Sequence, residues 1–108
     1  MPRLRRIDID AREKVSEELS RFVRRLRRRY GPSAVYVFGS FARGELHEGS
    51  DVVVVGDFRE RFFDRVAKVS ELTELPMDVL VYTPEEFEEM RRSGNPLILE
   101  VLERGVAL

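Results

Sequence analysis

Three short β-rich runs limit the folds open to this chain more than any other feature. They are SAVYVF at residues 33–38, DVVVV at 51–55 and MDVLVY at 77–82. Each run has the length and the branched or aromatic side chains typical of a strand. The intervals between them are too long for tight hairpins, and helical segments alternate with the strands. We therefore expect a single α/β (α+β) domain over residues 1–108, in which helices pack on a small mixed β-sheet.

Two long helices are expected on either side of the first strands. The first covers residues 10–30, because Asp10 can cap its start and Gly31-Pro32 ends it. Its apolar positions step by three and four and form one stripe: Val15, Leu19, Phe22, Val23, Leu26 and Tyr30. The second covers residues 59–74. Its helical spacing runs through Phe62, Phe63, Val66, Val69 and Leu72.

Local capping signals predict two more helices near the C-terminus. The run Thr83-Pro84-Glu85-Glu86 is a capping box with proline at the first helical position. Asn95-Pro96 opens a last helix, which Gly105 ends, and residues 106–108 are a candidate edge strand. A short helical turn is also expected at residues 41–46, after the first strand.

Composition excludes several classes of function. The chain has 19 basic and 20 acidic residues, so its net charge argues against a general nucleic-acid binder. It has no cysteine, which excludes disulfides, thiolate metal sites and a cysteine nucleophile. It shows no signal-peptide pattern and no apolar run near 18 residues, so we expect a cytoplasmic protein without membrane contact. Charge-rich composition with one Asn and no Gln is typical of proteins from hot environments.

The segment GSFARGELHEGSDVVVV at residues 39–55 contains the groups that a nucleoside triphosphate needs. Gly39 lets the backbone approach a phosphate closely, and Ser40 offers a hydroxyl group. Free N–H groups at the start of a helical turn attract anions, and Arg43 could add positive charge. Asp51 supplies the type of oxygen ligand that Mg²⁺ prefers. The segment therefore predicts a site for a triphosphate with its magnesium ion.

This segment resembles the signature of the nucleotidyltransferase superfamily that shares its fold with DNA polymerase β. It is most similar to the minimal, MNT-type members, whose pattern is Gly-Ser, ten residues, Asp-x-Asp and a third carboxylate on a neighbouring strand. Gly39, Ser40 and Asp51 match with the correct spacing, and Asp78 in PMDVLVYTPEE matches the third carboxylate. Other residues match types common in the loop of the family: Arg43, Gly44, Glu45 and Ser50.

The resemblance implies a role for each matching residue. Asp51 and Asp78 would be the catalytic carboxylates and would hold Mg²⁺. The nucleotide-binding residues would be Gly39, Ser40, Arg43 and Ser50. ATP would be the substrate.

One position departs from the family pattern, because Val53 stands where the second Asp of Asp-x-Asp belongs. Side chains two apart on a strand share a face, so that Asp would lie beside Asp51. Asp57 has the same parity but lies about 13 Å beyond Val53 at strand rise. In the family, the second Asp helps to bridge the two metal ions of nucleotidyl transfer, as the resemblance implies. We therefore expect Asp51 and Asp78 to hold one Mg²⁺ rather than two.

Three functions remain open on this basis. The resemblance implies an MNT-type antitoxin that transfers AMP from ATP to a tyrosine of a helical HEPN-type toxin. Val53 favours the alternative of a degenerate, non-catalytic protein that binds a nucleotide or its partner. A nucleotidyltransferase acting on RNA or on a small molecule is the third interpretation, and a homo-oligomer is left open.

Other features have both a structural and a functional interpretation. His47, the only histidine, lies in a loop and is expected to be exposed rather than catalytic. An arginine stripe could be a solvated helix face or a docking surface for RNA or an acidic partner: Arg21, Arg24, Arg25 and Arg28. The tyrosines could accept AMP, although core packing explains them too: Tyr30, Tyr36 and Tyr82.

Overall fold

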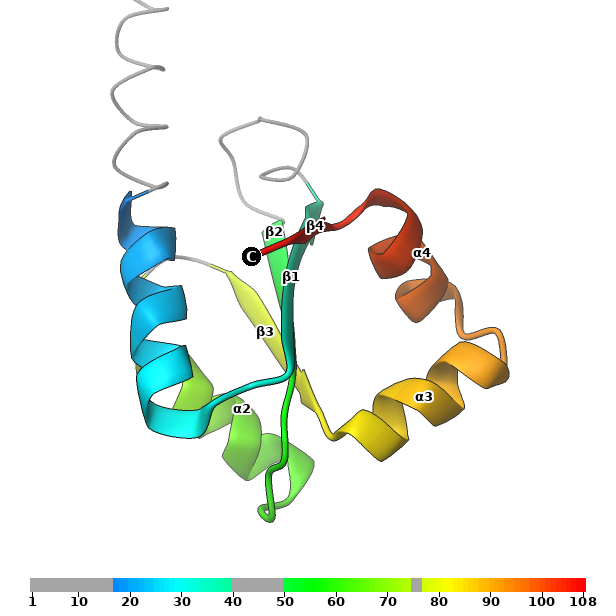
Figure 1. Cartoon of the computed structure of the whole chain (residues 1–108), viewed down its shortest axis with the longest axis horizontal. Helices are drawn as coiled ribbons and strands as arrows, with labels where there is room; N and C mark the ends of the chain where they lie inside the picture. Colours follow the sequence, from blue (N-terminus) through cyan, green and yellow to red (C-terminus); the bar gives the residue numbers. More distant parts are fainter. Residues whose placement is uncertain (1–16, 40–49, 75–76) are drawn as a thin grey trace, which may run out of the picture.

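The structure is a computed structural model that describes residues 17–39, 50–74 and 77–108. These residues form four helices and four strands (Figure 1). Residues 17–30 are helical. The remaining helices are α2 (Phe62–Ser70), α3 (Pro84–Arg92) and α4 (Pro96–Arg104). The strands are β1 (Ala34–Gly39), β2 (Ser50–Val55), β3 (Asp78–Tyr82) and β4 (Val106–Ala107).

The four strands form one mixed sheet with the order β3-β2-β1-β4. Strand β1 is antiparallel to both β2 and β4, whereas β2 and β3 run parallel. The parallel pair needs a long crossover, which α2 supplies. The predicted fold class, helices on a small mixed sheet, is confirmed.

Helices cover both faces of the sheet, as Figure 1 shows. Alternate strand residues point to opposite faces, so each face has its own apolar core. On the α2 face, helix 17–30 and α2 pack against valines of β1, β2 and β3, and Phe22 and Leu26 are fully buried there. On the α4 face, α3 and α4 cover a smaller cluster centred on Phe38, Val53, Val55 and Val101.

The predicted helix boundaries largely agree with the structure. Gly31 has a φ of 56° after the first helix, a conformation that favours glycine. Thr83 forms the predicted capping box with Glu86, and the Asn95 side chain accepts a hydrogen bond from the N–H of Leu97. Gly105 ends α4 in an extended conformation, and a Cβ there would lie 2.4 Å from the carbonyl oxygen of Val101. Residues 10–16 and 41–46 lie outside the described residues.

Helix α2 differs from the prediction in length and in the face it buries. It covers Phe62–Ser70 rather than residues 59–74, because the chain turns at residues 71–72. Phe63, which the spacing groups with the apolar positions, is 83% exposed, whereas Arg65 is buried. Burial of Arg65 is tolerated because its guanidinium group contacts the carbonyl oxygens of Glu60 and Val81 and the Glu86 carboxylate. Apolar periodicity alone could not reveal this network.

No helix among the described residues combines the length and the apolar character required to cross a membrane.

Candidate functional site

Strand register gathers the predicted site residues at one end of the sheet. Gly39 pairs with Ser50 across β1 and β2, and Phe38 pairs with Asp51. Asp51 pairs in turn with Asp78 across β2 and β3. Neighbouring strands lie about 4.8 Å apart, so the motif glycine and both carboxylates occupy three adjacent strands at the same edge. The sequence spacing therefore places these residues together in three dimensions.

Asp51 and Asp78 are register partners on neighbouring strands, and both lie on the α4 face with Val53 and Leu80. Asp51 is half-buried, and Asp78 is exposed. Burial raises the pKa of Asp51, and the charge and hydrogen bond of Asp78 and the charge of Glu100 raise it further. The negative charge of a carboxylate that lies beside two other acids is only partly compensated. A bound cation would relieve the repulsion between these acids.

Glu100 is a candidate site residue that the sequence did not reveal. It lies on α4, which packs Leu97 and Val101 against the α4 face of the sheet. Residue 100 lies three after Leu97 and one before Val101, so it flanks the buried side of the helix. Helical spacing could show that flanking position. Only the tertiary structure shows that α4 lies over the strand end that carries Asp51.

Val53 lies on the same face as Asp51, as its parity predicts, but it is covered by a helix. Its exposed fraction is 0%, and it packs in the cluster with Phe38, Val55 and Val101. Position 53 is therefore a core position under α4. An unpaired carboxylate at this position would lose its hydration.

A groove of about 400 Å³ runs from the two carboxylates along β3 to α2. We call it the edge groove, because β3 is the outermost strand of the described sheet. The described residues that line it include no arginine or lysine, and most of them are apolar. Its lining residues are Asp51, Phe62, Phe63, Val66, Ser70, Met77, Asp78, Val79 and Leu80.

The two carboxylates fit one divalent cation better than two. Mg²⁺ binds protein through one or two carboxylates and completes its coordination with phosphate oxygens and water. Asp51 and Asp78 form such a pair, and the described residues contain no group of three or more acids or histidines able to hold a metal ion. The predicted residues Ser40, Arg43 and His47 lie outside the described residues.

The three tyrosines pack against other rings. Tyr30 contacts Phe58 with ring centroids 5.2 Å apart, and Tyr82 contacts Phe62 at 5.6 Å. Tyr36 stacks on Phe87 at 6.0 Å. Burial raises the pKa of Tyr82, and the nearby charge of Glu86 raises it further. These contacts agree with the structural interpretation of the tyrosines.

Comparison with known proteins places these features in a family. The profile of the nucleotidyltransferase domain matches residues 19–107. Over 48 residues the chain is 42% identical to the protein adenylyltransferase MntA of Thermococcus cleftensis, an alignment that covers 44% of this chain and 48% of the relative. The match thus spans about half the length of that curated relative.

A solved structure shows the same fold. The crystal structure of a candidate nucleotidyltransferase from Sulfolobus solfataricus superposes with a TM-score of 0.64 and 21% sequence identity, covering 93% of this chain and 84% of that one. At this identity the likeness concerns the fold alone. Together with the domain match, it confirms the family resemblance that the sequence motif predicted.

Proposed function

Because the chain belongs to the nucleotidyltransferase domain family, we propose that it binds ATP with one Mg²⁺ and transfers AMP to a hydroxyl group of a partner protein. The observation that carries this proposal is the Asp51–Asp78 pair at the strand ends, beside the motif residue Gly39. The relative with the 42% match is named a protein adenylyltransferase, which favours AMP as the group and protein as the acceptor.

Each residue has a distinct part in this proposal. Asp51 and Asp78 would hold the ion, and Gly39, Ser40, Arg43 and Ser50 would contact the nucleotide, as in the family pattern. When bound, Mg²⁺ would neutralise charge on the triphosphate. Without it, two carboxylates near the phosphates would repel the nucleotide, so ATP binding should require a divalent cation.

The reaction replaces one bond to the α-phosphorus with another. The acceptor oxygen forms a bond to the α-phosphorus of ATP, and the bond between that phosphorus and the oxygen bridging to the β-phosphate breaks. Pyrophosphate leaves with the electrons of that bond, and the hydroxyl proton passes to water. The contribution of the protein is to position the two reactants and to compensate the charge.

The edge groove supports a protein acceptor. Its described lining residues offer no cation to a triphosphate, whereas they include the exposed ring of Phe63. An apolar segment of another protein could lie in this groove and bring a hydroxyl group to the carboxylates. We propose a helical HEPN-type partner as the source of that segment, in a toxin–antitoxin pair.

The burial of Val53 favours a second candidate function. A core valine under α4 stands at the place of the bridging carboxylate, so Asp51 and Asp78 are the motif carboxylates that the described residues offer to the ion. A chain with this site could bind nucleotide and its partner without transferring AMP. In that case it would act by covering the partner.

Transfer of label separates the two candidates. The chain and the protein that co-purifies with it are incubated with Mg²⁺ and ATP labelled in the α-phosphate. We expect the partner to become labelled, and we expect Asp51→Asn to lower the rate at least about 100-fold. Asp57→Asn is the matched control, because Asp57 is an exposed acid beyond β2. Binding of an ATP analogue without any transfer would favour the second candidate.

A further inference from the structure

The outward side of helix 17–30 concentrates positive charge in a chain whose net charge is −1. The helix buries Leu19, Phe22 and Leu26 against the α2 face of the sheet, so its other sides face solvent. Six arginines and two glutamates in this range leave a formal charge of +4, and the range has no lysine. The arginines are Arg21, Arg24, Arg25, Arg27, Arg28 and Arg29.

Three of these six arginines form ion pairs or hydrogen bonds within the protein. Arg21 pairs with Glu17 at 3.6 Å and with Glu18 at 3.5 Å. Arg25 pairs with Glu18 at 3.5 Å and donates to the carbonyl oxygen of Leu72 at 3.0 Å. Arg27 donates to the Leu108 carbonyl oxygen at 2.6 Å. These contacts fix the side chains to the protein itself.

The other three arginines have no such partner. Among the described residues, Arg24, Arg28 and Arg29 form no hydrogen bond or ion pair, and all three are exposed. We call these three residues the arginine surface. Arg24 and Arg28 are one helical turn apart, so their side chains emerge on the same side of the helix. A guanidinium group presents a planar set of N–H donors that matches phosphate oxygens. The arginine surface offers three such groups without a partner among the described residues.

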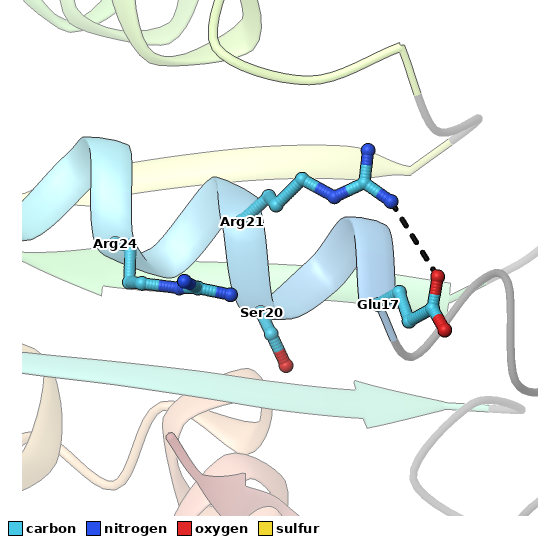
Figure 2. Close-up of a pocket in the computed structure, with 4 residues that line it drawn as sticks. All are labelled: Glu17, Ser20, Arg21 and Arg24. Atoms are coloured by element: carbon cyan, nitrogen blue, oxygen red, sulfur yellow. Dashed lines mark ion pairs between the residues drawn. The ribbon is translucent and has the colours of Figure 1, made fainter.

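Two shallow hollows flank the arginine surface. The first, of about 400 Å³, is lined by Glu17, Ser20, Arg21 and Arg24. Figure 2 shows Arg21 turned toward Glu17, while Arg24 extends along the helix on the side of Ser20, whose hydroxyl can also donate to a phosphate. The second, of about 340 Å³, is lined by Arg25, Arg28, Arg29 and Leu72.

The chemistry of this region fits a polyanion better than a protein. Protein interfaces bury an apolar or aromatic centre. The exposed large apolar residues of the described chain all lie on other elements: Phe63, Leu99, Leu102 and Val106. Among the described residues that line the two hollows, the single apolar one, Leu72, is buried. Charge without an apolar centre is the pattern expected for phosphate-backbone contacts.

We propose that the arginine surface binds single-stranded RNA through its phosphates. From Arg24 to Arg29 the helix rises about 7.5 Å, which suits two or three consecutive phosphates of one flexible strand rather than both strands of a duplex. The arginine surface lies on the α2 side of the sheet, whereas Asp51 and Asp78 point to the α4 face. RNA held there leaves the carboxylates free, so the proposal does not depend on nucleotide transfer.

The test is fluorescence anisotropy of a labelled 20-nucleotide oligouridine with the full chain in 50 mM KCl. Three phosphate contacts to a single strand predict a log–log salt slope of about −2, so 200 mM KCl should weaken binding about 20-fold. We expect Arg24→Glu/Arg28→Glu to weaken binding at least tenfold. The matched control is Arg92→Glu/Arg104→Glu, which makes the same change of net charge on α3 and α4 and should stay within twofold.

Four results would overturn the proposal. They are an absence of binding at 100 µM protein, equal losses in both double variants, tighter binding of duplex DNA, and tighter binding of polyglutamate than of RNA. The last would assign the arginine surface to an acidic protein. Circular dichroism melting of each variant excludes unfolding as the cause of a loss.

Discussion

The two ends of β3 hold their acidic side chains in opposite ways. Beyond the C-terminal end, Glu86 accepts hydrogen bonds from the Thr83 N–H at 2.8 Å and from the buried Arg65 at 2.5 Å. Burial opposes the charge of Glu86, yet these hydrogen bonds and the arginine charge lower its pKa overall. At the N-terminal end, Asp78 lies beside Asp51, and the pKa of Asp51 is raised.

This contrast separates a structural end of the sheet from the end that carries the candidate site, which we call the functional end. The Arg65–Glu86 pair joins α2 to the start of α3. Among the described residues, no buried side-chain nitrogen or oxygen lacks a hydrogen-bond partner, and this includes those of Arg65. The Asp51–Asp78 pair instead keeps like charges together, which costs stability in the absence of a ligand. Uncompensated groups of this kind are typical of binding and catalytic sites. The predictions below alter one end at a time.

The largest effect is expected from a third carboxylate at the functional end. Val53→Asp places an acid at a fully buried position under Val101 of α4. We expect the free energy of unfolding to fall by about 3–4 kcal/mol at pH 7, because the charge loses its hydration. Urea denaturation measures this change, with Val53→Thr as a near-isosteric control that should cost less. A loss below about 1 kcal/mol would show that α4 does not cover this position.

Breaking the structural end should have the next largest effect. Arg65→Met keeps the volume of the side chain but removes the guanidinium donor from the Glu60 and Val81 carbonyl oxygens. The Glu86 carboxylate also loses this donor and keeps its hydrogen bond from the Thr83 N–H. We expect a loss of about 2–3 kcal/mol by urea denaturation, less than for a fully buried pair because the Glu86 side chain is 44% exposed.

The pH dependence of the stability loss in Arg65→Met serves as the control for this prediction. Because the pKa of Glu86 is lowered, its stabilising contribution is present above the ordinary glutamate value and is lost as pH falls through the lowered one. The difference between wild type and Arg65→Met should therefore shrink under acid conditions. A difference that stays constant with pH would assign the loss to packing rather than to the ion pair.

Removing the charge repulsion at the functional end should have the smallest effect, and it should raise the stability rather than lower it. Asp51→Asn removes one of two like charges, so we expect the ligand-free protein to melt about 2–4 °C higher at pH 7. Since the pKa of Asp51 is raised, the penalty is absent below its ordinary value of 3.8 and grows as pH rises. Melting curves of both proteins from pH 4 to 7 should diverge. A lower melting temperature for Asp51→Asn would contradict the contrast.

Sequence signals predicted most of the fold because they are local. The capping box at Thr83, the Asn95 cap and the positive φ of Gly31 each depend on a few neighbouring residues. The pairing of Asp51 with Asp78 depends on sheet register, which the sequence does not contain directly. It could be anticipated because the family motif carries that long-range information.

The remaining features required the tertiary structure. The burial of Arg65 and the exposure of Phe63 invert the apolar pattern of α2, and only the partners of Arg65 explain the inversion. Likewise, Val53 was expected to border the site, but α4 covers it and brings Glu100 near Asp51. Sequence spacing defines which residues share a face, whereas the packing of helices decides what covers that face.

The most direct test of the proposed site counts the metal ions that bind at the carboxylate pair. Mn²⁺, which accepts the same oxygen ligands as Mg²⁺, is titrated into the chain with a non-hydrolysable ATP analogue and followed by electron paramagnetic resonance. We expect one Mn²⁺ per chain, which is lost in Asp51→Asn and retained in the control Asp57→Asn. Two ions per chain, or one ion that persists in Asp51→Asn, would contradict it.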